Sequence, residues 1–230
     1  MKTIGLLGGM SWESTAHYYS ALNRGVKNAL GGLHSAKIAM ISLDFAPIEK
    51  LQQNGDWPAS AVILSEAAKS IESAGADFLM ICTNTMHIVA PEIEKSITIP
   101  ILHIADATAE TIKSKALKTV GLLGTKFTME KDFYKGRLQD KHGINVITPK
   151  KTEREIVHNV IMKELCLGKI EPSSKEKYLQ IIEQLAQQGA EAVILGCTEI
   201  GMLVSQEDTD VILLDTTAIH SDKAVEMAVG

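Results

Sequence analysis

Aromatic residues are scarce in this chain, at 4%, and only three cysteines occur among its 230 residues. The odd number of cysteines and their wide spacing (Cys82, Cys166 and Cys197) suit reduced thiols and match neither a disulfide framework nor a zinc pattern. Basic residues are not in excess, and the net charge of −5 argues against binding to nucleic acid or an anionic membrane. No apolar run approaches the ~18 residues of a membrane span, and the apolar N-terminus is too short for a signal peptide. We therefore expect a cytoplasmic protein with neither nucleic acid nor membrane as a partner.

Nucleotide-binding motifs are also missing. The glycine-rich stretch Gly5–Gly9 lacks the Gly-x-Gly-x-x-Gly spacing, and no Gly-Lys-Ser/Thr occurs. The stretch is read either as a tight strand-to-helix turn or as a backbone nest for an anion. With no cofactor motif and no metal-ligand spacing, we expect neither a cofactor nor a metal.

Short apolar runs alternate with amphipathic stretches along the whole chain, which predicts parallel strands joined by crossover helices, an α/β fold. The expected strands are 3–8, 37–43, 77–81, 98–103, 118–124, 145–148, 189–195 and 211–214. The expected helices are 14–30, 58–74, 87–95, 106–114, 129–141, 152–167, 173–188 and a final helix ending at residue 230. Residues 44–57 form a polar loop with room for a short helix.

The pattern repeats itself. Lys2–Gly8 recurs as Lys118–Gly124, 116 residues later, with one difference, Ile4 against Val120. A second match, 114 residues apart, aligns the stretch that begins at Gly75 with the one that begins at Gly189. These matches predict two tandem, Rossmann-like halves related by a pseudo-two-fold axis: residues 1–100 with 215–230, and residues 101–214. Ligands bind outside the carboxyl ends of parallel strands, so we expect an active site in a cleft between the halves.

The strongest candidate site is Gly196-Cys-Thr-Glu199, directly after an apolar strand. A thiol before a helix start is expected to have a lowered pKa, which favours the reactive thiolate. Thr198 offers donors to an anion. Glu199 is either a carboxylate at a helix N-terminus or a catalytic group.

The 114-residue match pairs Thr83 with Cys197 and Asn84 with Thr198. Because strand side chains alternate between faces, Thr83 should share the orientation of Cys197 while Cys82 points into the interior. Two nearby histidines, His87 and His103, either assist a thiol or are hydrogen-bonded supports. Gln52 is either a ligand or part of a solvated loop.

At these residues the chain resembles the cofactor-independent aspartate/glutamate racemase family. The resemblance covers essentially the whole chain and is carried by Gly8-Gly-Met10, Asn84-Thr85, Gly124-Thr125 and Gly196-Cys-Thr-Glu199. It implies an active site between two α/β halves, a pair of cysteines on opposite faces of the substrate Cα, and a homodimer. The position of the first cysteine is Thr83 here, so the chain is most similar to the L-aspartate/glutamate-specific subgroup with a Thr/Cys pair. The arginine and lysine that select aspartate in typical members are replaced, and Lys50 or Gln52 are the candidates to serve instead.

The expected activity is therefore racemisation of aspartate or glutamate, a small-molecule substrate, with Cys197 as thiolate base and Thr83 on the opposite face. The expected substrate-binding residues are Met10, Ser11, Gln52, Asn84, Thr85, Thr125, Thr198 and Glu199. A hydantoin racemase, maleate isomerase or arylmalonate decarboxylase, which share the fold, is the alternative enzyme. A small-anion binding module without catalysis is the non-enzymatic alternative.

Overall fold

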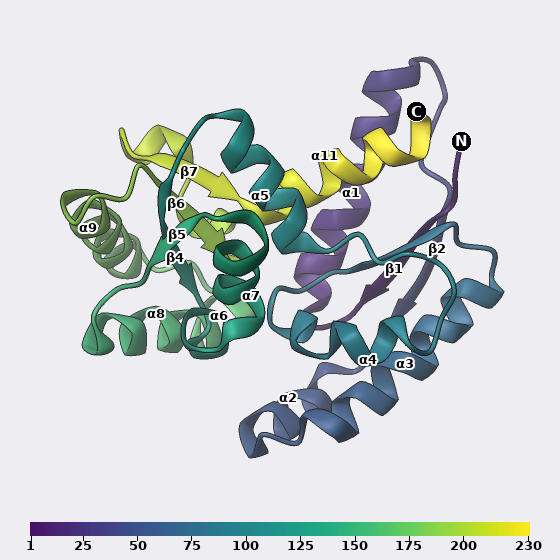
Figure 1. Cartoon of the computed structure of the whole chain (residues 1–230), viewed down its shortest axis with the longest axis horizontal. Coiled ribbons are helices and arrows are strands. Elements are labelled where there is room, and N and C mark those ends of the chain that lie inside the picture. The colour runs from purple at the N-terminus through teal and green to yellow at the C-terminus, as the bar shows by residue number, and fades with distance from the viewer. The chain divides into compact units, whose positions relative to one another are not determined.

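The computed structural model describes all 230 residues and divides into two compact units (Figure 1). One unit comprises residues 1–104 and 220–230, and the other comprises residues 105–219. Each unit contains one parallel sheet flanked by helices, which confirms the predicted α/β fold. None of the helices has both the length and the apolar character needed to cross a membrane.

The N-terminal unit is built on a three-stranded parallel sheet of order β2-β1-β3. Its strands are β1 (Ile4–Gly8), β2 (Ile38–Ser42) and β3 (Phe78–Ile81). Its helices are α1 (Trp12–Leu30), α2 (Phe45–Asn54), α3 (Trp57–Ser73), the 3-10 helix η1 (Thr85–Val89) and α4 (Ala90–Glu94). The last helix of the chain, α11 (Thr216–Val229), supplies its residues from His220 onward to this unit.

The C-terminal unit has a four-stranded parallel sheet of order β5-β4-β6-β7. The strands are β4 (Thr119–Gly124), β5 (Asn145–Ile147), β6 (Ala192–Gly196) and β7 (Ile212–Asp215). The longer helices are α5 (Ile104–Ser114), α8 (Lys151–Lys163) and α9 (Pro172–Gln187). The short ones are α6 (Lys126–Glu130), α7 (Asp132–Gly136), the π-helical turn η2 (Arg137–Lys141), η3 (Leu165–Leu167), α10 (Ile200–Leu203) and η4 (Gln206–Asp208).

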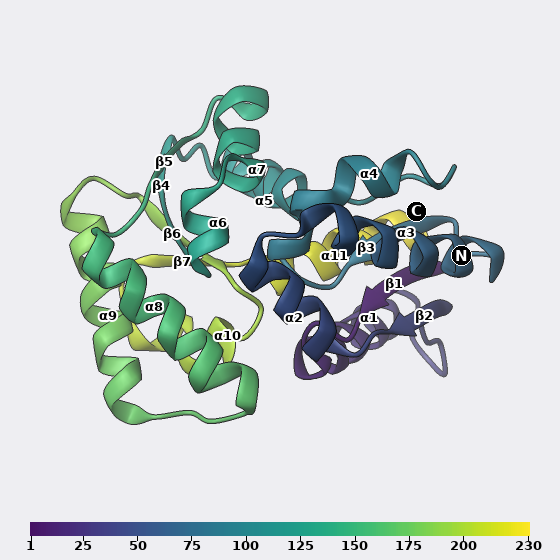
Figure 2. The same ribbon diagram turned by 90° about the horizontal axis from the view of Figure 1, so that it is seen from below.

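In the N-terminal sheet, β1 and β3 are buried on both faces, because successive side chains alternate between the faces and helices cover each of them. Leu7, Leu79 and Ile81 pack under α3 and α4, whereas Ile4, Met80 and their neighbours pack under α1 and α11. In the C-terminal unit, α8 and α9 lie side by side over one face of the sheet (Figure 2). That face carries Leu123, Val193, Leu195 and Cys197.

The strand registers reproduce the internal repeat. Ile4 lies opposite Phe78 in the first sheet. The 116- and 114-residue matches carry this pair to Val120 and Ala192, which lie opposite each other in the second sheet. The two sheets therefore share one pairing scheme at their central strands, and the sequence repeat identifies structurally equivalent positions.

The predicted strand at 98–103 is wrong except for a single parallel bridge between Leu79 and Ile101. The ladder stops on the N-terminal side because Pro100 has no N–H to donate. It stops on the C-terminal side because the N–H of Ile104 donates to His87 and the carbonyl of Leu102 accepts from His220.

The structure defines the short helix for which the sequence left room and corrects one helix prediction. Residues 44–57 contain the ten-residue helix α2, started by the Asp44 side chain, which accepts from Ala46 N–H, and ended by Gly55 in the left-handed region. The predicted helix 129–141 is instead three short helices, broken by the extended backbone of Lys131.

Candidate active site

The thiol-bearing loop follows β6, next to the end of β4. Gly124 and Gly196 lie opposite each other in the register. A Cβ added to Gly124 would approach the Gly196 carbonyl oxygen to 2.8 Å, and one on Gly196 would approach the Leu123 oxygen to 2.6 Å. Only glycine fits at both positions, so the loops after β4 and β6 leave the sheet in close contact.

The side chains after Gly196 form one small hydrogen-bond cluster. Cys197 Sγ donates to Glu199 Oε2 over 2.9 Å, and Thr198 Oγ1 donates to the same oxygen over 2.8 Å. Cys197 and Glu199 are both buried. Glu199 therefore accepts a hydrogen bond from the thiol, which favours the second of its two predicted roles, that of a catalytic group.

The predicted lowering of the Cys197 pKa is wrong for the free protein. Burial raises the pKa of the Cys197 thiol well above its usual value, and the charge of Glu199 raises it further. The helix expected to stabilise the thiolate, α10, has only four residues, which leaves little dipole to act on the thiol. At rest the cysteine is a protonated donor to Glu199.

The neighbouring loop after β4 contains Thr125, a buried residue that begins α6. Its hydroxyl oxygen accepts from Thr128 N–H over 3.4 Å. Register places Thr125 beside Cys197, since each directly follows one of the paired glycines. The C-terminal unit thus brings together Thr125, Cys197, Thr198 and Glu199.

In the N-terminal unit, the side chain of Cys82 points into the interior, as predicted, which leaves Thr83 on the opposite face of the sheet. Cys82 N–H still donates to Leu7 O over 2.9 Å, so the ladder runs one residue past β3. The Cys82 side chain is fully buried with Met80 under α1, and burial raises the pKa of its thiol. Alternation then puts Thr83 on the same side as Ile81. In the C-terminal unit, Cys197 likewise lies on the same face of its sheet as Leu195, the residue two positions before it.

The loop after β1 carries Met10 and Ser11, which are both buried. Gly9 has φ +90°, and a Cβ there would lie 2.1 Å from the Leu43 carbonyl oxygen. The N–H of Gly9 donates to Thr15 Oγ1 over 2.8 Å, which removes it from the expected set of anion donors.

Ser11 begins α1, and its hydroxyl oxygen accepts from Ser14 N–H. Ser14 Oγ in turn donates to Cys82 O over 3.3 Å, joining this loop to the end of β3, a link that the sequence did not indicate.

Gln52 is buried and is not part of a solvated loop. Its Nε2 donates to Met86 Sδ over 2.9 Å, so it lies against the turn that follows Thr83. Asn84 and Thr85 begin that turn and are also buried. Lys50, the other candidate for substrate selection, is exposed on α2. The N-terminal unit therefore groups Gln52, Asn84 and Thr85 around the end of β3.

Both rings of the predicted histidine pair are buried in the N-terminal unit, with centroids 4.4 Å apart. His87 Nε2 accepts from Ile104 N–H over 3.3 Å, so this nitrogen carries no proton. The other ring nitrogen, Nδ1, lies 2.8 Å from the carbonyl oxygen of Thr83 and must be the donor. His87 is a neutral support with a fixed tautomer, and no thiol is its hydrogen-bond partner among these contacts.

Two parallel-sheet units, each with polar side chains at the ends of its central strands, define an α/β enzyme with a thiol at one of these ends. Residues 7–224 match the family described as Asp/Glu/hydantoin racemase. The chain belongs to this family, and membership makes it an isomerase of the amino-acid racemase class.

Three similar proteins support the assignment. A crystal structure of a Yersinia pestis protein, described provisionally as an Asp/Glu racemase, is 53% identical over the full length of both chains, with a TM-score of 0.93. An aspartate racemase homologue from Pyrococcus horikoshii is 34% identical over the full length of both chains, with a TM-score of 0.86. The broad specificity amino-acid racemase RacX of Bacillus subtilis is 24% identical over 96% of each chain.

Proposed function

We propose that this protein racemises an acidic amino acid, aspartate or glutamate, without a cofactor, using Cys197 and Thr83 on opposite faces of the substrate Cα. The observation that carries the proposal is the hydrogen bond of 2.9 Å from Cys197 Sγ to Glu199 Oε2 at the end of a buried strand. The equivalence of Thr83 and Cys197 in the internal repeat supports the second assignment.

Glu199 is assigned the activation of the Cys197 thiol, whose pKa is high in the free protein. When the substrate ammonium group binds, its positive charge favours movement of the thiol proton onto Glu199 and leaves a thiolate. The thiolate then takes the Cα proton, and the bonding electron pair remains on the substrate as an enediolate. The carboxylate that raises the pKa at rest thus becomes the group that activates the thiol in the complex.

The enediolate needs hydrogen-bond donors around the substrate α-carboxylate. We assign this role to the loops that contain Met10 and Ser11, Asn84 and Thr85, Thr125, and Thr198. By analogy with oxyanion donors, each contact lowers the barrier by roughly 3 kcal/mol. Gln52 is assigned to the side chain of the substrate, because it is a buried amide at the turn after Thr83.

Thr83 completes the reaction from the other face. Its hydroxyl gives a proton to Cα, and a solvent proton replaces it in the same step because an isolated alkoxide is costly. A threonine hydroxyl donates far better than it accepts a carbon-bound proton. Turnover is therefore unequal, and faster from the enantiomer whose Cα proton points at Cys197.

Chiral chromatography of L- and D-aspartate, L- and D-glutamate and a 5-substituted hydantoin, each incubated with the protein, tests the proposal. We expect inversion of the acidic amino acids and none of the hydantoin. Inversion of the hydantoin alone would assign the other activity in the family's description.

We also propose that the protein acts as a homodimer. Two large aromatic side chains, Trp12 and Tyr19, lie seven residues apart on α1 and are 67% and 52% exposed. Light scattering coupled to size exclusion should give about twice the chain mass of 24.9 kDa, and a mass of 24.9 kDa would contradict the proposal.

A further inference from the structure

Three buried histidines of the N-terminal unit are left without a role by the proposed chemistry: His87, His103 and His220. The rings of His87 and His220 are 6.1 Å apart between centroids. The hydrogen bonds of His220 join it to Tyr18 and to the backbone of Leu102, and those of His87 join it to the backbone of Thr83 and Ile104. All of these partners are uncharged groups.

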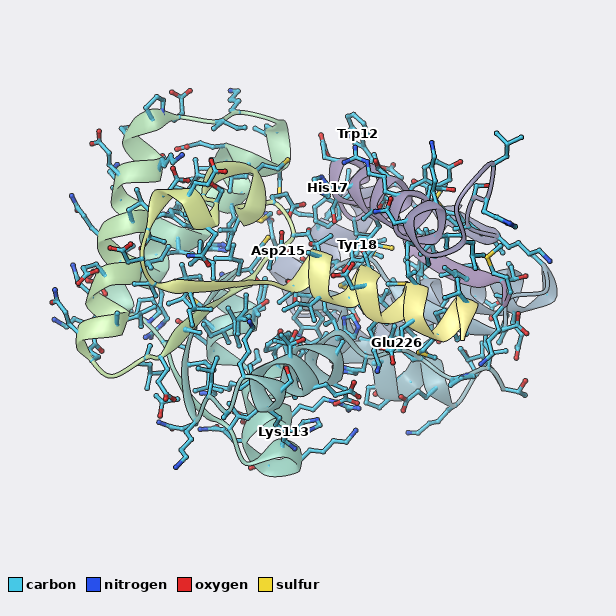
Figure 3. All side chains as sticks on the ribbon, turned by 90° about the horizontal axis from the view of Figure 1, so that it is seen from above. Trp12, His17, Tyr18, Lys113, Asp215 and Glu226 are labelled. Atoms are coloured by element: carbon cyan, nitrogen blue, oxygen red, sulfur yellow. The ribbon has the colours of Figure 1, made fainter.

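The chemistry of the partners determines the direction of these hydrogen bonds. His220 Nε2 lies 2.8 Å from Leu102 O, and a carbonyl only accepts, so Nε2 carries the proton. The other nitrogen, Nδ1, is then the acceptor for the Tyr18 hydroxyl at 3.0 Å. Tyr18 lies on α1 where that helix passes α11 (Figure 3). Burial lowers the pKa of His220 to about 4, which agrees with a neutral ring.

A second pair of hydrogen bonds begins close to Leu102 in the chain and ends at the proposed reaction site. Two residues later, Ile104 N–H donates to His87 Nε2, and His87 Nδ1–H donates to Thr83 O. The four bonds form two separate relays, Tyr18–His220–Leu102 and Ile104–His87–Thr83, because the Leu102 carbonyl and the Ile104 N–H belong to different peptide groups. Within each relay the two bonds share one imidazole ring, through which they polarise and strengthen one another. The second relay ends on the backbone of the residue that is proposed to protonate the substrate.

We propose that His87 is a positioning residue, which fixes the Thr83 backbone so that the Thr83 hydroxyl faces the substrate Cα. The proposal rests on the proposed racemase function. His87 holds two segments together, the end of β3 and the segment after Ile101, and it does so with both ring nitrogens. Its two ring nitrogens are engaged with backbone groups, one of them the Thr83 carbonyl, so we expect its effect on the reaction to pass through Thr83.

A positioning role makes a specific kinetic prediction. For the enantiomer whose Cα proton points at Cys197, exchange of this proton with retention of configuration uses only the Cys197 face, whereas inversion also needs Thr83. His87→Phe preserves an aromatic ring but removes both hydrogen bonds. We expect it to slow inversion by about tenfold or more and to change retentive exchange in D2O by less than twofold. His17→Phe is the matched control, because His17 is an exposed residue of α1. This variant should change neither rate.

A double-mutant cycle with Thr83→Ala separates positioning from general support. The His87 bond is made to the backbone carbonyl of Thr83, so it survives this substitution. The loss of unfolding stability from His87→Phe should therefore be the same in both backgrounds, while its effect on inversion should disappear in the Thr83→Ala background. A milder variant, His87→Asn, retains a donor near Nδ1 and should recover part of the inversion rate.

The tautomer is measurable without activity. Long-range 15N–1H spectra of the folded protein at neutral pH should show His87 protonated at Nδ1 and His220 at Nε2. Equal loss of inversion and retentive exchange in His87→Phe, or the opposite tautomer at His87, would overturn the positioning role. Absence of any Cα exchange by the wild type would overturn the proposed function instead, while the spectra would still report the two hydrogen-bond relays.

Discussion

At the residue scale, Glu199 has two opposed effects on Cys197. Its charge raises the pKa of the thiol, and its oxygen is the nearest acceptor for the thiol proton. The sequence located both residues at the strand end, but it predicted a lowered pKa. That error arose because a linear pattern shows neither the length of α10 nor the depth of burial of the thiol.

The two effects of Glu199 predict opposite changes in Glu199→Gln. Removing the charge lowers the Cys197 pKa, so alkylation of Cys197 by iodoacetamide at neutral pH should become faster. Removing the proton acceptor should slow racemisation by about a hundredfold, within the range of general acid–base contributions. Glu207→Gln, an exposed site with the same change in charge, is the control. Faster alkylation together with faster racemisation would show that Glu199 only raises the pKa of the Cys197 thiol and does not accept its proton during the reaction.

Because Thr83 is a poorer base than Cys197, we predict that Thr83→Cys makes the rates of racemisation in the two directions more alike. A thiol at this position both gives and takes a proton, so the ratio of kcat from the two enantiomers should move toward one. Cys82→Ala, which alters the buried neighbour, should leave the ratio unchanged. An unchanged ratio in Thr83→Cys would remove Thr83 from the mechanism.

At the element scale, Asp106 in the first turn of α5 joins that helix to η2. It pairs with Arg137 through two bonds of 2.7 Å, with Lys141 at 2.7 Å and with His142 at 2.9 Å. Partial burial alone would raise its pKa, but the bonds from Arg137, Lys141 and His142 hold the pKa of Asp106 well below its usual range. The pairing therefore stabilises the fold above the unfolded pKa of about 4 and is lost as pH falls below it.

Asp106→Asn should lower the free energy of unfolding by about 1–3 kcal/mol at pH 7, since the site is partly exposed and the charged bonds are several. The difference from wild type should shrink as pH approaches 4 and below. Urea unfolding at each pH measures it. Asp132→Asn, whose carboxylate lies 3.8 Å from Lys135 and is 90% exposed, should cost far less. Equal losses for the two variants would contradict the role of the cluster.

The elements also show what a sequence can and cannot specify. Repeated apolar runs predicted the central strands, because burial on both faces demands such runs. Their register came from the structure, which showed that the repeat aligns equivalent pairs. The strand at 98–103 is reduced to one bridge because Pro100 has no N–H and because the next backbone groups bond to the side chains of His87 and His220. The proline is visible in the sequence, but these two side-chain contacts are not. Helix α2 lies where the sequence left room for a short helix, but its bounds were not predicted, because its start depends on a contact of the Asp44 side chain within a polar stretch.

At the scale of the whole molecule, stability should depend on pH through His220. This histidine lies on α11, where the chain returns to the N-terminal unit, and it is fully buried. Its folded pKa of about 4 lies below the unfolded value of about 6.5. The unfolded state therefore binds the extra proton, and stability falls as pH drops from about 6.5 to about 4, by roughly 3 kcal/mol from this group.

Denaturant unfolding of the wild type and His220→Gln across this interval isolates the contribution. The glutamine keeps a donor for Leu102 O but does not titrate, so the pH dependence of the variant should be flatter. Identical curves for the two proteins would contradict the neutral, buried state of His220.

The central claim is that Cys197 removes the Cα proton of an acidic amino acid. Loss of the Cα–H NMR signal of L- and D-aspartate in D2O, followed with wild type and Cys197→Ser, tests it most directly. We predict exchange from both enantiomers by the wild type at unequal rates, and a loss of about 10²–10⁴-fold in the variant, as expected for removal of an acid–base group. Exchange by Cys197→Ser at the wild-type rate would contradict the account.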